Sequence, residues 1–173
     1  MNQEKIIEVI MYTLPALISG IIAVYYFKEY VKSDAGLEKF KLLKENTKEF
    51  TKLKLQAYER LTLFLERTSL NKLATRVHPA NDNKQAYAMA LIHTIETEFD
   101  HNITQQIYVS EELWNIIQTA KNRSIQIIRE LSQDPNIKNA QQLREAIINY
   151  VMEKQSPSEA ALSVLKSEVN RLV

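Results

Sequence analysis

The sequence contains no cysteine, and only two of its 173 residues are glycine and four are proline. The absence of cysteine excludes disulfides, thiolate catalysis and cysteine-based zinc sites. Because Gly20 and Gly36 are the only glycines, the chain cannot build a glycine-rich phosphate-binding loop, and it also lacks the His-Glu-x-x-His zinc signature. We therefore expect a protein that is not an enzyme, with no catalytic residues, no cofactor and no metal.

Neither sign of charge is in large excess, since 22 lysines and arginines face 21 acidic residues and the formal net charge is +1. Such a balance gives no overall attraction to nucleic acid or acidic substrates. We therefore expect partners to be selected by local surfaces, and we do not expect nucleic acid among them. The scarcity of glycine and proline, together with many leucines, isoleucines, lysines and glutamates, predicts an all-α fold.

Residues 9–27 form a stretch of nineteen residues without a charged side chain. As a helix it would be about 28 Å long, close to the hydrocarbon thickness of a bilayer. The main alternative is a cleaved signal peptide, but cleavage after Ala23 or Gly20 would place Ile21 or Ile18 where a small residue is required. The stretch is therefore predicted to be a retained transmembrane helix.

Lysines are concentrated on the C-terminal side of this stretch, whereas only Lys5 precedes it. The five juxtamembrane lysines are Lys28, Lys32, Lys39, Lys41 and Lys44. Because positive residues remain on the cytoplasmic side, we expect a periplasmic N-terminus and a cytoplasmic C-terminal domain. The same lysines are expected to contact anionic lipid headgroups.

The apolar stretch carries small residues on one side of the predicted helix. Ala16 with Gly20, and Ser19 with Ala23, form two overlapping small-xxx-small pairs, the spacing that lets helix backbones approach closely in lipid. Small residues are also common in membrane helices without any packing role. Since the chain has one span, a packing face would meet another chain, either a different membrane subunit or a second copy.

The organisation predicted is a transmembrane helix with its juxtamembrane extension in residues 1–34, followed by a cytoplasmic helical domain with an N-terminal stalk in residues 35–173. A hinge is expected at residues 34–36 and a helix over residues 37–67. Residues in the second half of that helix form a core stripe: Leu53, Ala57, Leu61, Phe64 and Leu65. Upstream, Phe40, Leu43 and Phe50 follow a coiled-coil spacing that Thr47 and Lys54 interrupt, which favours packing inside the domain.

Capping patterns divide the rest of the chain into helical segments. A short segment over residues 69–77 is followed by helices over residues 83–101, 111–133, 139–154 and 157–172. Their starts are marked by Asp82 with Gln85, Ser110, Asn139 with Gln142, and Ser156 with Pro157. The residues expected to face the core are Ala88, Leu91, Ile92, Ile95, Phe99, Leu113, Trp114, Ile117, Ile125, Ile128, Leu131, Leu143, Ile147, Tyr150, Val151, Ala161, Leu162, Leu165 and Val169. Residues 102–109 fit a loop or a helical extension.

One polar cluster has residue types suited to a metal site: His93, Glu96, Glu98, Asp100 and His101. Glu98 and His101 have the Glu-x-x-His spacing of di-iron helix bundles. However, most of the cluster projects opposite the apolar stripe of its helix, and a di-iron core needs inward carboxylates on facing helices. The pattern favours a solvated helix face over a metal site.

Several segments resemble a family of short, membrane-anchored, functionally uncharacterised proteins of Bacteroidota. The resemblance is carried by Leu55, Ala57, Tyr58, Glu59, Arg60, Leu61, Leu63 and Phe64, then by Glu98, Phe99, Asp100, His101, Asn102, Gln105, Gln106, Ile107, Tyr108 and Val109, and by Trp114, Ala120 and Lys121. It implies a bacterial inner-membrane protein and brings no catalytic residue. Within it, the polar segment formed by His101, Asn102, Gln105, Gln106 and Tyr108 is a candidate partner contact.

These patterns favour a non-catalytic accessory or scaffold subunit of a larger inner-membrane complex. Two alternatives stay open. One is a structural membrane protein that self-associates through its small-residue face. The other is an adaptor that tethers a soluble partner, such as the ribosome, through the lysine-rich residues 28–60.

Overall fold

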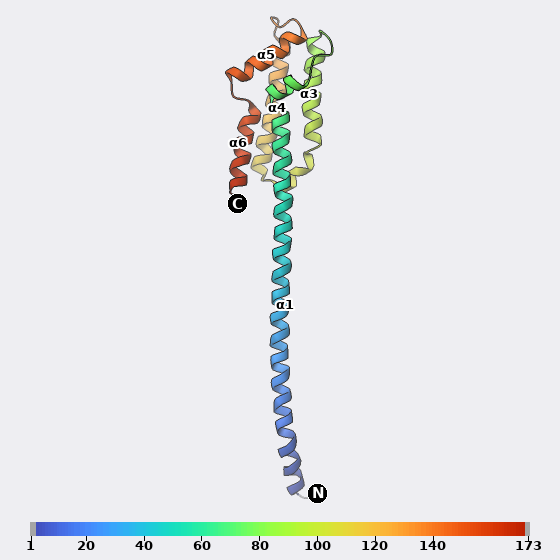
Figure 1. Ribbon diagram of the computed structural model, residues 1–173, viewed down its shortest axis with the longest axis vertical. Helices are drawn as coiled ribbons and strands as arrows, with labels where there is room; N and C mark the ends of the chain where they lie inside the picture. Colours follow the sequence, from blue (N-terminus) through green and yellow to red (C-terminus); the bar gives the residue numbers. More distant parts are fainter. Residues whose placement is uncertain (1–2, 172–173) are drawn as a thin grey trace. The chain divides into compact units, whose positions relative to one another are not determined.

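The computed structural model describes residues 3–171, with side chains for residues 11–32 and 36–171. Within this part of the chain every regular element is helical, which confirms the predicted all-α fold (Figure 1). The elements are α1 (Gln3–Arg67), α2 (Leu70–Arg76), α3 (Lys84–Asp100), the 3-10 helix η1 (Ile103–Tyr108), α4 (Glu111–Gln133), α5 (Ala140–Glu153) and α6 (Pro157–Asn170).

Helix α1 continues through residues 34–36, so the predicted hinge is wrong. A glycine inside a helix costs only about 1 kcal/mol relative to alanine, and the strong helix formers that follow Gly36 offset that cost. The chain divides into two structural units, Met1–Phe50 and Thr51–Val173. The predicted boundary after residue 34, which concerned the membrane, stays a prediction.

The apolar residues in the middle of α1 do not pack inside the domain as expected. Phe40, Leu43 and Phe50 are more than half exposed, and Leu53, predicted to lie in the core, is 43% exposed. Burial along the helix begins at Ala57. Spacing alone identifies an apolar face, but how far the neighbouring helices reach along α1 decides which part of that face is covered.

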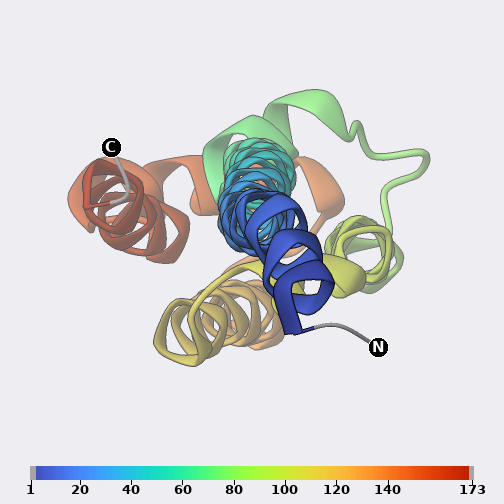
Figure 2. The ribbon, with the colours of Figure 1, turned by 90° about the horizontal axis from the view of Figure 1, so that it is seen from below.

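Helix α4 is the central element of the Thr51–Val173 unit, because it contacts α3, α5 and α6. Figure 2 shows α4 between α6, in red, and α3, in yellow-green. The first core cluster joins α2, α3 and α5 to the C-terminal half of α4. The second joins the end of α1, Phe99 and α6 to its N-terminal half.

The predicted core residues after residue 80 all lie in or against these clusters. Sequence reasoning missed Ile127, which is 1% exposed. It lies off the apolar stripe of α4 and is buried because α4 has neighbours on more than one side.

Helix starts follow the predicted caps, with two corrections. Ser110 Oγ accepts a hydrogen bond from Leu113 N, and Asn139 Oδ1 accepts one from Gln142 N, as expected. The cap of α3 is Asn83 rather than Asp82, since Asn83 Oδ1 accepts from the N–H groups of residues 85 and 86. Ser156 precedes α6, but its side chain makes no capping bond, and its hydroxyl is buried without a hydrogen-bond partner.

Candidate functional site

The apolar part of α1 exposes its side chains instead of packing them within the chain. Among its residues with described side chains, which begin at Met11, helix α1 contains a segment that is long and apolar enough to cross a membrane by length and composition. None of that segment is buried within the chain. The side chains of residues 9 and 10, which the predicted span includes, lie outside the described residues. Exposed isoleucine, leucine and aromatic side chains therefore make up most of the surface of this segment.

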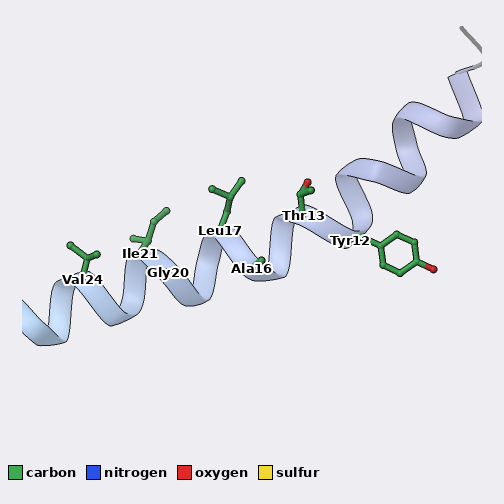
Figure 3. A pocket seen from close by; sticks show the side chains of 7 residues that line it. All are labelled: Tyr12, Thr13, Ala16, Leu17, Gly20, Ile21 and Val24. Carbon is green, nitrogen blue, oxygen red and sulfur yellow. The ribbon is translucent and has the colours of Figure 1, made fainter.

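A groove runs along this surface beside Gly20. It is lined by Tyr12, Thr13, Ala16, Leu17, Gly20, Ile21 and Val24. Figure 3 shows that Ala16 has a short side chain and Gly20 none, while larger side chains project beside them from Leu17, Ile21 and Val24. A Cβ atom added at Gly20 would meet nothing within 4 Å. The groove therefore has room for a side chain or a backbone from outside the chain.

Of the four residues predicted to pack against another membrane helix, two line this groove. Ala16 and Gly20 line it, whereas Ser19 and Ala23 are exposed beside it. Ser19 Oγ donates a hydrogen bond to Ala16 O at 3.0 Å, so its hydroxyl is satisfied inside its own helix. A serine satisfied in this way can face an apolar environment at little cost.

The five juxtamembrane lysines are all exposed and make no salt bridge in the described part of the chain. At about 100° per helical residue, Lys28, Lys32 and Lys39 fall on one face of α1. Lys41 and Lys44 fall on another. The first three lysines therefore form a row of free ammonium groups on one side of the helix.

The polar segment predicted as a partner contact is the 3-10 helix η1 with its preceding turn. Asn102 Nδ2 donates to Glu98 O at 2.8 Å, and Gln105 is buried, so both side chains are used within the fold. His101 and Gln106 are exposed, and Tyr108 is half-buried. Two apolar side chains that sequence reasoning did not select, Ile103 and Ile107, are exposed beside them.

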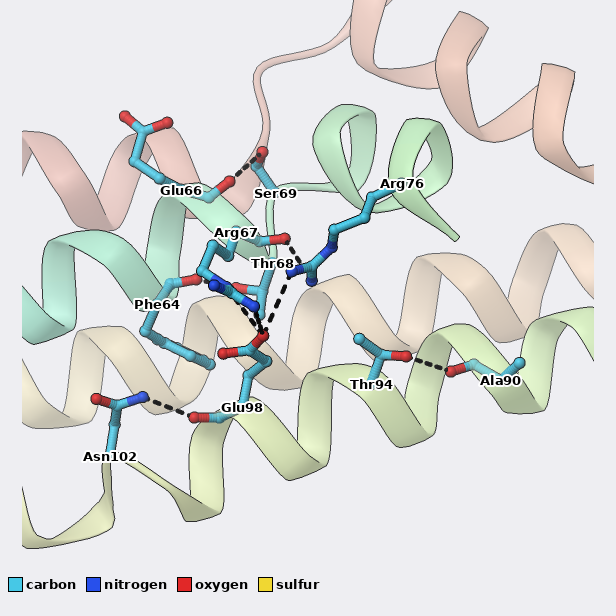
Figure 4. Close-up of polar contacts among 10 residues, drawn as sticks. All are labelled: Phe64, Glu66, Arg67, Thr68, Ser69, Arg76, Ala90, Thr94, Glu98 and Asn102. Carbon is cyan, nitrogen blue, oxygen red and sulfur yellow. Dashed lines mark hydrogen bonds and ion pairs between the residues drawn. The ribbon is translucent and has the colours of Figure 1, made fainter. Parts of the chain in front are cut away.

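Glu98 takes part in an ion-pair cluster, whereas the sequence had placed the polar cluster of its helix on a solvated face. Its Oε1 accepts from Arg67 Nε at 2.9 Å and Arg67 Nη2 at 2.6 Å, and it lies 3.4 Å from Arg76 Nη1 (Figure 4). The cluster ties α3 to α1 and α2. His93, Glu96, Asp100 and His101 are exposed, and the described residues contain no group of three or more that could hold a metal ion.

A second carboxylate cluster, which sequence reasoning missed, centres on Glu168. Tyr58 OH donates to Glu168 Oε1 at 2.7 Å, and Ser110 donates to the same carboxylate from N at 3.1 Å and from Oγ at 2.6 Å. These bonds and the charge of Lys54 lower the pKa of Glu168, although burial acts in the opposite direction. Burial, followed by the bond to Glu168, raises the pKa of Tyr58. The cluster thus fixes α6 to α1 and to the start of α4 with an ionised carboxylate.

Replacing Ser110 by alanine is expected to lower the free energy of unfolding by about 1–2 kcal/mol, because it removes an N-cap and a hydrogen bond to a charged group. Ser156 is the matched control. It has a similar cap backbone but no capping bond, and its buried hydroxyl is unpaired. Ser156→Ala should be neutral or stabilising. Urea unfolding followed by the fluorescence of Trp114 compares them, and equal losses in both variants would contradict the assignment.

The described residues define an all-helical protein with a long exposed apolar helix at its N-terminal end and a helical unit after it. The chain belongs to a family of unknown function (DUF7935), whose sequence profile matches residues 4–172. This confirms the expected relation to an uncharacterised family. A search of curated proteins and a search of solved structures gave no match.

Proposed function

We propose that this protein is a non-catalytic accessory or scaffold subunit of a bacterial inner-membrane complex, anchored by one helix. The observation that carries the proposal is the unburied apolar segment of α1. An exposed apolar surface of this length is unfavourable in water and is normally covered by lipid or by another protein. The resemblance to membrane-anchored proteins of Bacteroidota supports a bacterial membrane as the setting.

The N-terminus is then periplasmic and the Thr51–Val173 unit cytoplasmic. The free lysine row on α1 supports this orientation, because unpaired lysines close to a span favour the cytoplasmic side. Each such lysine near an anionic surface contributes up to about 1 kcal/mol of attraction. The lysines therefore supply both the orientation and a contact with lipid headgroups.

The partner in this proposal is another membrane subunit that fills the groove beside Gly20. Within lipid, helices gain little from hydrophobic burial against each other, so close packing over small residues provides much of their attraction. Ala16 and Gly20 permit that approach, and Leu17 and Ile21 supply the flanking van der Waals surface.

The proposal is tested by extracting the tagged full chain in a mild detergent and identifying copurifying proteins by quantitative mass spectrometry. We expect one or more membrane proteins in fixed ratio with the chain, retained at high salt. A monomer without copurifying protein would overturn the proposal. Partners that dissociate as the salt concentration rises would instead favour an adaptor acting through its lysines.

The groove also suits a second copy of the chain, which makes a self-associating structural protein the second candidate. Gly20→Ile is expected to abolish most of the dimer formed in membranes, because its side chain would occupy the space that a neighbouring helix requires. The substitution meets nothing within the chain itself.

Gly36→Ile is the matched control for this experiment. Gly36 lies in the same helix, and a Cβ added there also meets nothing within 4 Å. Both variants change helix propensity alike, so a difference between them reports on contacts made by the Gly20 face. Crosslinking in membranes followed by denaturing electrophoresis measures the dimer. An unchanged dimer in Gly20→Ile rejects self-association through this face.

A further inference from the structure

A second groove, distant in sequence from the apolar segment, lies between the end of α1 and α2. It has a volume of about 510 Å³ and is lined by Leu63, Glu66, Arg67, Asn71, Lys72, Thr75 and Arg76. Leu63 is 54% exposed, so its side chain offers apolar surface to a ligand in the groove. The aliphatic stems of the arginines and the lysine extend this apolar surface, with their charged groups at its edge.

The charges around the groove are not balanced. Arg67, Lys72 and Arg76 face two carboxylates, those of Glu66 and Glu98. Lys72 pairs with Glu66, so two guanidinium groups share the single carboxylate of Glu98. The groove therefore keeps one positive charge.

That charge belongs chiefly to Arg76. Its contacts with Glu98 and with Arg67 O are both 3.4 Å long, at the outer limit for a hydrogen bond, whereas Arg67 approaches Glu98 to 2.6 Å. The Arg76 side chain is 39% exposed. Figure 4 shows its guanidinium reaching from α2 toward the Arg67 and Glu98 pair. Arg76 thus retains donors for an acceptor from outside the chain.

We propose that this groove binds an acidic segment of a partner protein, in which a carboxylate pairs with Arg76 and an adjacent apolar side chain packs on Leu63. A guanidinium fork matches the geometry of a carboxylate. The exposed leucine favours a peptide with an apolar side chain beside its carboxylate over a nucleic acid, whose backbone alternates charged phosphates with polar sugars. The inference rests on the proposed function for the existence of a protein partner and adds the chemistry of its contact.

The test uses the full chain in nanodiscs of zwitterionic lipid and three fluorescent helical peptides of equal length. The first alternates glutamate and leucine along one face, the second has glutamine for every glutamate, and the third has serine for every leucine. Fluorescence anisotropy at low salt measures affinity. We expect binding of the first peptide and at least about tenfold weaker binding of the other two, a difference of about 1.4 kcal/mol.

Two pairs of variants locate the contact. Arg76→Gln should weaken binding of the first peptide about tenfold, and Arg129→Gln, which replaces an exposed arginine on α4, should not. Leu63→Ser should weaken it similarly, while Met89→Ser, at a residue that is 70% exposed on α3, should not. Leu63 has little packing to lose, so this variant remains informative if Arg76→Gln is unstable.

The proposal is overturned if the glutamine peptide binds as tightly as the glutamate peptide, or if both groove variants bind like the wild type. Absence of binding by the first peptide up to about 1 mM overturns it as well. The two proposals can fail independently. If the peptide does not bind, membrane subunits can still copurify with the chain. If no subunit copurifies, the peptide can still bind to the groove.

Discussion

Phe64→Ala is expected to lower the free energy of unfolding of the Thr51–Val173 unit by about 3–5 kcal/mol, the range for deleting a buried aromatic side chain. Phe64 is 1% exposed and lies edge-on to Phe99, with ring centroids 5.8 Å apart. Phe99 stacks in turn on Trp114 at 5.3 Å. The cavity would open within the second core cluster, and the favourable contact between the Phe64 and Phe99 rings would be lost.

The matched control is Phe40→Ala, in the same helix but 66% exposed. It removes the same atoms without opening a cavity, so we expect a change within about 0.5 kcal/mol. Urea unfolding of the purified protein, followed by Trp114 fluorescence and by circular dichroism, measures both. A loss in Phe40→Ala comparable with that in Phe64→Ala would show that the middle of α1 contributes to the fold, contrary to its exposure.

Local rules predicted most of the helical elements because their causes lie within a few residues. Ser110 and Asn139 mark helix starts because a side-chain oxygen reaches an N–H group in the next turn. Leu113 and Ile117 belong to a stripe that is read from helical periodicity, and both are fully buried. The shift of the α3 cap from Asp82 to Asn83 is the error of one residue that such signals allow.

Features that depend on distant residues could not be predicted in this way. Glu168 meets Tyr58 across 110 residues of sequence, and nothing near either residue indicates the other. The continuity of α1 past Gly36 reflects a balance of small propensities, which single-residue signals misjudge. Phe40 fits a packing pattern as well as Phe64 does, and only the extent of the neighbouring helices separates them.

The candidate surfaces divide in the same manner. Ala16 and Gly20 could be selected from spacing because both lie on one helix, and both line the groove on α1. That another helix packs there stays a prediction. The pairing of Arg76 with Glu98 joins two helices and had no local signal. Sequence reasoning noted the metal-type spacing of Glu98 and His101 and favoured a solvated helix face, because relations within one helix were the only ones visible to it.

Ile18→Arg combined with Ile21→Arg is expected to remove the chain from the membrane. Both isoleucines are exposed near the middle of the predicted span. Arginine at the centre of a membrane helix costs about 2.5–3.5 kcal/mol by insertion experiments, so two replacements oppose insertion by about 6 kcal/mol. After carbonate washing, the wild-type chain should remain in the membrane pellet, and the double variant should be found in the soluble fraction or be degraded.

Phe40→Arg combined with Leu43→Arg is the matched control, with the same spacing and comparable exposure on the same helix. These residues lie beyond the predicted span, so their replacement should leave the protein in the pellet. If the isoleucine variant also stays there, residues 9–27 do not anchor the chain by crossing the bilayer, and the proposed orientation fails with it. If the wild type is washed out, the exposed apolar surface of α1 is covered by protein rather than by lipid. The pair of variants therefore distinguishes a lipid-covered span from a helix that docks on a partner. Gly20→Ile cannot make this distinction, because a spanning helix and a docked helix would both use the groove beside Gly20.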